Sequence, residues 1–445
     1  MERVFVWPDY RRYGAVALLG VALVVAGCSE RIEGGGVCPA LCPTHPLSTE
    51  QVSVLADSTS QATPTVVGFP TRGNEGTILV TNRGDTLESR MIVRFDSIPA
   101  THAPTAGSST RDSTTNIDSM RLKLRYEASS LLNLPITLNV YDVDTTAADT
   151  NDAAVLALFR PDRLVGTTTL TAADTGLIRQ LPDTGSRPAD SVDAVFVPID
   201  SAWLIDRIRT GRRIRFGIQA LGAGSVQIRF FGSEDAGGRY ALLRFDPSPS
   251  TATTVLTFAP LSTTPVENAL VAYDLNDYSV VAIPLDDPPS GAFAVGGWPA
   301  RRAVMRFRLP AAIVDSATVV RATLTLTQVP APSPDIDTPM SISANPVNAR
   351  GTITDVARLA AMASDISVSA VAVRPGADST ITLELGVLVR SWANRDTIDV
   401  PRVLVLRANP EGNARMAWFF GADAPSAVKP RLEITYIPRS AVGLP

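Results

Sequence analysis

Apolar and polar residues alternate along many short segments of this chain. The clearest segment is residues 120–126, which read Met-Arg-Leu-Lys-Leu-Arg-Tyr. Side chains of a β-strand point alternately to its two faces, so this pattern predicts a strand with one apolar, buried face and one cationic face. The same alternation predicts strands at residues 136–140, 216–220, 226–230, 324–326 and 432–436.

Burial of only one face in these strands predicts antiparallel sheets packed as a sandwich, because the strands of a parallel α/β core are buried on both faces. β-Branched residues dominate the alternating segments, and turn-forming residues separate them. We therefore predict an all-β fold.

Helical patterns are scarce. Residues 201–209 form the best candidate, in which Asp200 or Ser201 can cap the start and Gly211 can end the helix. A second candidate runs from residue 387 to residue 393, where an apolar pair at a spacing of four, Leu388 and Trp392, shares one face.

The chain contains an internal repeat. Residues 91–99 (Met-Ile-Val-Arg-Phe-Asp-Ser-Ile-Pro) align with residues 303–310 (Ala-Val-Met-Arg-Phe-Arg-Leu-Pro). Further along, Phe-Phe-Gly-Ser-Glu-Asp at 230–235 matches Phe-Phe-Gly-Ala-Asp at 419–423, and the two predicted helices fall at equivalent places. Matches in the same order predict two copies of one domain.

The N-terminal segment has the pattern of a secretory signal. Arg11 and Arg12 precede an apolar run over residues 13–26 that ends in small residues. Val-Ala-Gly-Cys at 25–28 resembles a bacterial lipobox, and the resemblance implies cleavage before Cys28 and acylation of that cysteine. The alternative is an uncleaved anchor helix, although the run is shorter than the roughly 20 apolar residues that a spanning helix needs.

These features predict the organisation of the whole chain. Residues 1–27 are expected to be a lipoprotein signal peptide, and residues 28–62, rich in Gly, Pro, Ser and Thr, a lipidated flexible tether. Two β-sandwich domains follow at 63–254 and 255–445, each long enough for its own core. The lipid implies a place in the cell envelope, and Ser29 after the cysteine is typical of outer-membrane lipoproteins; periplasmic and surface-exposed positions both stay open.

Two further cysteines, Cys38 and Cys42, lie in the predicted tether. In an oxidising compartment we expect them to form a small-loop disulfide. A metal site would need two more soft or imidazole ligands, and only His45 lies near. Free thiols are the third alternative.

Composition and motifs argue against two classes of function. The net charge is −4, whereas a protein that binds nucleic acid usually carries a basic excess. The only histidines are His45 in the tether and His102 in a predicted loop, where we expect a solvated side chain. Two Asp-Thr-Gly triplets, at 174–176 and 183–185, lack the apolar flanks of aspartic proteases and are expected to form turns. We therefore expect neither enzymatic activity nor a nucleic-acid partner.

One acidic loop is a candidate cation site. Asp142, Asp144, Asp149 and Asp152 follow a predicted strand, and calcium takes roughly six to eight oxygen ligands. The loop lacks the glycine and the terminal glutamate of an EF-hand. A solvated acidic turn is the alternative, and no other cofactor is expected.

Two features are candidates for contact with a polysaccharide. Arg121, Lys123 and Arg125 form the polar face of one predicted strand, and guanidinium groups match the geometry of the carboxylates on an acidic glycan. Carboxylates on neighbouring strands could neutralise these cations instead. Trp298 lies in a predicted loop, where an exposed indole could stack on a sugar ring; burial in the core or under a loop is the alternative.

The order of these segments resembles the DNRLRE-type domain, which is grouped with carbohydrate-binding module family 96. The early Arg-Phe-Asp strand of that family is matched within residues 90–99 and more loosely within 302–310, and its Ala-x-Leu-x-Leu strand at 322–326. The closing Pro-Arg-Leu-x-x-x-Tyr strand is matched within 429–436, whereas the first copy lacks the proline at 239–242. The resemblance implies tandem jelly-roll-like β-sandwiches and a non-catalytic role, in some members the binding of polysaccharide.

We therefore expect a non-catalytic, lipid-anchored binding or adhesion protein of the cell envelope, with polysaccharide as the favoured ligand. The alternative is a structural component of an envelope assembly that binds other envelope proteins. An exposed Trp298 and a basic sheet face favour the first function. An exposed apolar patch or an unpaired edge strand favours the second.

Overall fold

The described part of the chain covers residues 49–438 of a computed structural model, with gaps at 57–64, 97, 105–107, 145–150, 175–193, 249–254, 262–274, 331–337, 348–352, 354, 364–367, 369, 378 and 394–401. The predicted signal peptide and the three cysteines, Cys28, Cys38 and Cys42, lie outside the described residues. No helix in the described ranges is long and apolar enough to cross a membrane. Residues Thr49–Ala441 belong to one compact unit.

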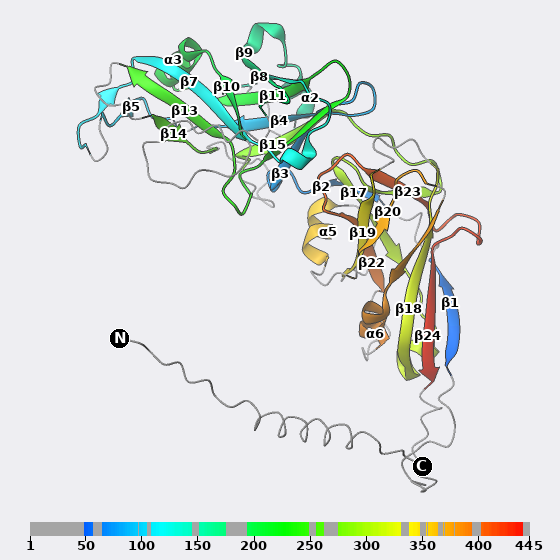
Figure 1. The fold of residues 1–445 in the computed structure, drawn as a ribbon. Coiled ribbons are helices and arrows are strands. Elements are labelled where there is room, and N and C mark those ends of the chain that lie inside the picture. Colours follow the sequence, from blue (N-terminus) through cyan, green and yellow to red (C-terminus); the bar gives the residue numbers. More distant parts are fainter. Residues whose placement is uncertain are drawn as a thin grey trace, which may run out of the picture. The chain divides into compact units, whose positions relative to one another are not determined.

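The first sandwich consists of two antiparallel sheets (Figure 1). A four-stranded sheet has the order β10-β7-β13-β14, and a seven-stranded sheet has the order β12-β3-β4-β11-β8-β9 with β15 paired to β4. Apolar side chains of both sheets, such as Leu122 and Ile218, meet in one core. The strands are β3 (Thr77–Asn82), β4 (Glu88–Arg94), β7 (Asn116–Arg125), β8 (Ile136–Asp142), β9 (Leu164–Leu170), β10 (Ala194–Pro198), β11 (Arg215–Leu221), β12 (Val226–Phe231), β13 (Leu242–Ser248), β14 (Leu256–Phe258) and β15 (Asp277–Ile283).

The second sandwich repeats this plan. Its four-stranded sheet has the order β1-β24-β18-β21, and its seven-stranded sheet has the order β20-β19-β22-β17-β16-β23 with β2 paired to β17. Leu324 of one sheet and Leu406 of the other lie in a common core. The strands are β1 (Glu50–Leu55), β2 (Thr65–Phe69), β16 (Ala292–Gly296), β17 (Ala300–Arg306), β18 (Ala317–Thr327), β19 (Met340–Val347), β20 (Val371–Val373), β21 (Thr380–Glu384), β22 (Val403–Asn409), β23 (Met416–Phe420) and β24 (Arg431–Pro438).

The predicted all-β fold is confirmed, and so is the one-sided burial on which it was based. In β7, Leu122 and Leu124 are fully buried, whereas Arg121 between β10 and β13 is exposed. A short additional hairpin joins β5 (Thr101–His102) to β6 (Asp112–Ser113).

Both predicted helices are present. Helix α3 spans Ser201–Thr210; the Asp200 carboxylate accepts the backbone N–H of Ala202, and Gly211 ends the helix at a φ of +62°. A left-handed residue at this position suits glycine, which has no Cβ to clash. Helix α6 spans Gly386–Ala393 and buries Leu388 and Trp392, as predicted. The other α-helices in the described ranges are α2 (Asp152–Leu156), α4 (Ala311–Ser316) and α5 (Val356–Met362), and two short 3-10 helices lie at Ala128–Ser130 and Pro161–Arg163.

The predicted repeat appears in the strand order. Replacing β3, β4, β8, β9, β11 and β12 by β16, β17, β19, β20, β22 and β23 converts the order of one large sheet into that of the other. The same holds for the small sheets, where β7, β10, β13 and β14 correspond to β18, β21, β24 and β1. The two copies therefore share one topology.

The first two strands of each copy complete the sandwich of the other copy. β1 and β2 precede the first sandwich in the chain but pair with β24 and β17 of the second. β14 and β15 precede the second sandwich but pair with β13 and β4 of the first. The two repeats thus exchange equivalent strands within one chain.

This exchange differs from the predicted domain boundaries. Residues 28–62 were expected to be a tether, but Glu50–Leu55 form β1, which pairs over its whole length with β24. The predicted boundary between residues 254 and 255 would assign β14 and β15 to the second domain, although both strands complete sheets of the first. Sequence alignment of the repeats does not reveal this, because the alignment finds equivalent strands and not their partners.

A separate apolar cluster joins residues of the two repeats. Leu79 and Leu87 of the first repeat pack with Trp298 and Trp418 of the second. The Trp298 indole N–H donates to the Ser89 hydroxyl at 2.7 Å, and that hydroxyl donates to the Leu79 carbonyl at 2.8 Å. The cluster also contains Leu285, Ala294, Ala414 and Met416.

Leu79→Ala should destabilise the protein by about 2–5 kcal/mol, because it opens a cavity in this cluster. Because each sandwich contains strands of the other repeat, we expect one unfolding transition in both the original and the variant protein. Denaturant unfolding followed by circular dichroism and by tryptophan fluorescence measures both quantities.

Val387→Ala is the matched control, since Val387 on α6 is 61% exposed. Its effect should stay within about 0.5 kcal/mol. Two separate transitions, of which Leu79→Ala shifts only one, would contradict the mutual dependence of the sandwiches.

Candidate functional site

Trp298 does not serve as an exposed platform. Its side chain is 1% exposed and lies in the cluster between the repeats, with its indole N–H bonded to Ser89. The predicted role of Trp298 in stacking on a sugar is therefore wrong, and the alternative, burial, is correct. The sequence could not decide this, because residues that contact Trp298 or share its cluster, such as Ser89 and Leu79, come from the other repeat.

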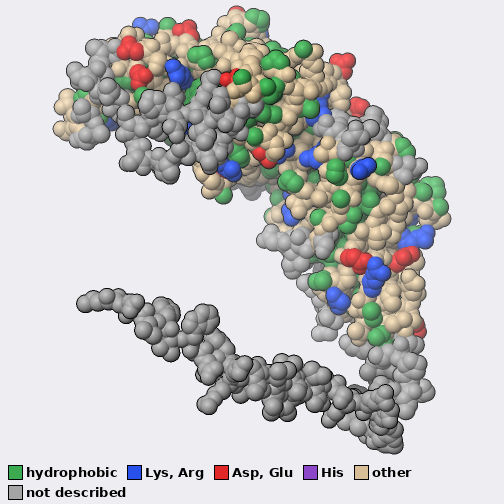
Figure 2. All heavy atoms as spheres, in the orientation of Figure 1, with side chains coloured by type: hydrophobic (Ala, Val, Ile, Leu, Met, Phe, Trp, Pro, Cys, Tyr) green, Lys and Arg blue, Asp and Glu red, His purple; other side chains and the backbone are tan. Residues whose placement is uncertain are grey.

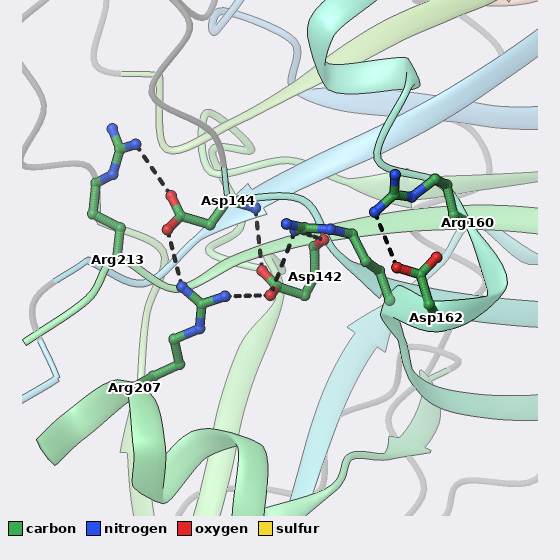
Figure 3. Close-up of polar contacts among 7 residues, drawn as sticks. Asp142, Asp144, Arg160, Asp162, Arg207 and Arg213 are labelled. Atoms are coloured by element: carbon green, nitrogen blue, oxygen red, sulfur yellow. Dashed lines mark hydrogen bonds and ion pairs between the residues drawn. The ribbon is translucent and has the colours of Figure 1, made fainter. Parts of the chain in front are cut away.

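The acidic loop after β8 is an ion-pair network (Figure 3). The Arg207 guanidinium, from α3, donates to the Asp142 carboxylate and lies 2.9 Å from Asp144 Oδ2. Arg213 lies 3.1 Å from Asp144 Oδ1, and Arg163 lies 3.6 Å from Asp142 Oδ2. Three guanidinium groups thus compensate two carboxylates.

This network engages Asp142 and Asp144, two of the four predicted calcium ligands. Asp152 at the start of α2 pairs with Arg72 at 2.5 Å, and Asp149 lies outside the described residues. In the described ranges, no group of three or more His, Cys, Asp or Glu side chains is placed to hold a metal ion. The alternative, a solvated acidic turn, does not hold at Asp142 and Asp144, because arginines distant in the sequence pair with both carboxylates.

His102 is buried, whereas the sequence predicted a solvated side chain. Its side chain is 4% exposed in β5, and Nδ1 lies 3.1 Å from the Thr114 hydroxyl oxygen. In the register of the hairpin its backbone stands opposite Asp112.

The cations of β7 lie together on the outer face of the small sheet β10-β7-β13-β14. Arg121 is exposed, and Lys123 and Arg125 are half-buried. Arg244 of β13 stands directly opposite Arg121 and adds a fourth cation. We call Arg121, Lys123, Arg125 and Arg244 the cationic band.

The residues that stand directly opposite the three cations of β7 are apolar or basic. On β10, Pro198, Phe196 and Ala194 stand opposite Arg121, Lys123 and Arg125. On β13, Leu242 stands opposite Lys123. No carboxylate stands directly opposite Arg121, Lys123 or Arg125 in the register. The alternative, in which carboxylates on the neighbouring strands neutralise the cations, stays a prediction.

A carboxylate does lie on the neighbouring strand β13, diagonal to Arg121. Asp246, two residues beyond Arg244, stands opposite Ser119 and accepts its hydroxyl at 2.7 Å. Lys123, Arg125 and Arg244 each have further interactions within the chain. The band is thus defined by the placement of its cations and not by unpaired charge.

The second repeat shows whether the fold needs these cations. Tyr126 forms an isolated bridge with Phe230, and Gln328 forms the equivalent bridge with Phe419. Tyr126 and Gln328 are therefore equivalent positions. Arg125, Lys123 and Arg121 lie one, three and five residues before Tyr126, and their equivalents at the same offsets before Gln328 are Thr327, Thr325 and Thr323 of β18.

The fourth cation is also replaced in the second repeat. Glu433 stands opposite Thr323 as Arg244 stands opposite Arg121. The same sheet therefore forms with three threonines and a carboxylate, so the cationic band is not required by the fold.

An aromatic ring borders the cationic band. Phe196 of β10 is half-buried on the same face, and the Lys123 ammonium lies 5.8 Å from the centre of its ring. This places an apolar surface beside a cation, an arrangement that suits a sugar ring carrying a carboxylate. The sequence analysis did not select Phe196, because its neighbour Lys123 is about seventy residues away in the chain.

A second polar surface, also missed from the sequence, crosses the large sheet of the first repeat. Hydrogen bonds link side chains of β9, β8, β11 and β4, with the rings of Tyr141 and Phe159 5.3 Å apart beside them. The alternating Thr137, Asn139 and Tyr141 of β8 were the available signal. The bonds run from Thr167 to Asn139 (2.8 Å), from Asn139 to Tyr141 (3.2 Å), from Tyr141 to Gln219 (3.3 Å), from Gln219 to Glu88 (2.8 Å) and from Arg90 to Glu88 (2.8 Å).

Comparison with known proteins gives no family. No family model matches the chain, and no curated protein matches its sequence significantly. Among solved structures, the chain is similar at 10% identity to T=1 particles derived from infectious bursal virus, over 86% of this chain and 77% of the other, with a TM-score of 0.12. The infectious bursal disease virus VP2 subviral particle matches at 10% identity over 86% and 79%, with a TM-score of 0.11. TM-scores this low support no conclusion about fold or function.

Arg207→Ala should destabilise the protein by about 3–5 kcal/mol, because it leaves Asp142 and Asp144 with less compensating charge in a largely buried site. Arg209→Ala on the same helix is the control: Arg209 is 76% exposed and its pair with Asp206 should contribute less than about 1 kcal/mol. Denaturant unfolding measures both. Equal effects of the two variants, or a rise in Tm of the original protein on addition of calcium, would contradict the ion-pair assignment.

Proposed function

We propose that this chain is a non-catalytic, lipid-anchored protein of a bacterial cell envelope whose cationic band binds an acidic polysaccharide. Anchoring rests on the lipobox-like segment ending at Cys28, and Ser29 favours the outer membrane. Tandem jelly-roll-like domains of the DNRLRE type remain part of this proposal.

The observation that carries the proposal is the contrast between the two repeats. One fold places Arg121, Lys123 and Arg125 on a sheet face in the first repeat and threonines at the same positions in the second. Since the fold tolerates threonine there, the cations call for another explanation. Guanidinium and ammonium groups beside Phe196 fit a ligand that combines carboxylates with apolar ring faces, as uronic acid polymers do.

The alternative, a structural component that binds envelope proteins, has less support. Among the described residues, the exposed large hydrophobic side chains come from separate elements: Leu55, Val67, Leu164, Val255, Leu261, Val320 and Val387. On the face seen in Figure 2, hydrophobic side chains are interspersed with polar and charged ones. A protein-binding surface is more often one contiguous apolar patch.

The proposal is tested by measuring how the full-length protein in detergent binds polygalacturonate, alginate and uncharged dextran at low ionic strength, where charge pairing is least screened. We expect binding to the two polyuronates and not to dextran. The triple variant Arg121→Thr, Lys123→Thr, Arg125→Thr copies the second repeat and should weaken binding at least about tenfold, which corresponds to about 1.4 kcal/mol.

The control variant removes the same charge elsewhere. Arg160, Arg209 and Arg321, whose side chains are 54%, 76% and 64% exposed, are replaced together by threonine. Its affinity should fall less than about threefold, because net charge acts mainly on encounter. Equal losses in both variants, or no binding of either polyuronate, would refute the proposal and turn attention to protein partners.

A further inference from the structure

Two buried carboxyl groups lie where the exchanged strands meet the first sandwich. Glu75 lies in the connection from β2 to β3, along which the chain passes from the second sandwich to the first. Asp277 is the first residue of β15, the strand that the second repeat contributes to the first sandwich. Their exposed fractions are 2% and 1%.

Both carboxyl groups are bonded to serines across the exchange. Glu75 Oε1 accepts the backbone N–H of Ser279 in β15 at 3.3 Å and its hydroxyl at 3.2 Å. Asp277 accepts the backbone N–H and the hydroxyl of Ser233, in the turn after β12, both at 2.8 Å. Glu75 thus connects the first repeat to β15, and Asp277 connects β15 back to the first repeat.

The packing around the two groups is close. A Cβ built on Gly232 would lie 2.1 Å from the Glu75 backbone oxygen and 3.5 Å from Asp277 Oδ1. Gly232 therefore brings the turn after β12 close to both acidic residues, and a side chain there would clash with the Glu75 backbone.

In the part of the chain that the structure describes, the arginines near the pair each have another acidic partner. Glu234 in the turn after β12 adds repulsion to Asp277. Arg94, near the start of β15 on β4, places its guanidinium 2.9 Å from Asp96. Arg72, in the β2–β3 connection, lies over the Tyr278 ring and pairs with Asp152. At the far end of β15, Glu88 and Arg90 of β4 pair with each other.

We propose that Glu75 and Asp277 form a proton-dependent latch, which holds β15 on the first sandwich while the two groups are protonated and loosens this contact when they ionise. A serine hydroxyl can accept from a carboxylic acid or donate to a carboxylate. Both protonation states therefore stay hydrogen-bonded, and the difference between them is the charge buried at the crossing of the two repeats.

The pH range follows from burial. Desolvation raises the pKa of Glu75 from its ordinary 4.5 to about 7, and the pKa of Asp277 from 3.8 to about 7, with repulsion from Glu75 adding to the latter. An acid whose pKa is higher in the folded state binds more protons there than in the open state. Its stabilising contribution is therefore complete below the pKa of the open state, in which β15 is detached and the carboxyl group is solvated. The contribution is lost as pH rises from about 4 to about 7.

Hydrogen exchange of the full-length protein, followed by mass spectrometry between pH 5 and pH 8.5, tests the latch. After correction for the intrinsic exchange rate, we expect the opening constant of peptides covering β15 to rise between pH 5 and about pH 7, by up to about tenfold per pH unit for each titrating group, and to level off above that pH. Peptides covering β18 should have a smaller opening constant than those covering β15 at every pH, because β18 touches neither group and exchanges only when the whole fold opens. In the double variant Glu75→Gln, Asp277→Asn, protection of β15 should be independent of pH.

The matched control is Glu384→Gln, which neutralises an exposed carboxylate on β21 and should leave the pH profile of β15 unchanged. Persistence of the pH dependence in the double variant would overturn the proposal. If that variant does not fold, the original protein decides alone. An opening constant of β15 that does not change between pH 5 and pH 7 would equally refute the latch.

Discussion

The exchange of strands between the two repeats is the constraint on which the rest of this structure depends. A β-sheet edge presents unpaired N–H and C=O groups, and each sandwich pairs part of its backbone with two strands that lie in the other half of the chain. Neither core can therefore be completed by its own repeat alone. The cluster around Leu79 and Trp298 adds apolar burial to the same dependence. Buried acidic residues at such a crossing, Glu75 and Asp277, link the exchange to proton concentration.

Arginine has different roles in different parts of this fold. Arg94 is fully buried with Asp96, and Arg302 forms two hydrogen bonds to Glu411, at 2.8 and 2.7 Å. In these places a planar guanidinium fixes a loop or strand end through paired charge. The cations of β7 differ in their strand neighbours, since the residues directly opposite them in the register are proline, phenylalanine, alanine, leucine and arginine.

The internal repeat provides a comparison that a single domain could not. Equivalent strands with equivalent neighbours carry Arg121, Lys123 and Arg125 in one copy and threonines in the other, and the sandwich forms in both. Whatever the fold requires must be common to both copies, such as the alternating leucines of β7 and β18. Features present in one copy alone are the better candidates for function, and this reasoning favours the cationic band over Trp298, which is buried.

The sequence by itself determined the local structure of this protein. Alternation predicted the strands, Asp200 and Gly211 bounded α3, and matching segments revealed the repeat, because each of these signals depends on residues close together in the chain. Only the tertiary structure decided which strands pair across the repeats, what covers Trp298 and which arginines reach Asp142. Those contacts join residues far apart in the chain, and strand pairing is specified by complementary sheet edges and shared cores, not by any local pattern.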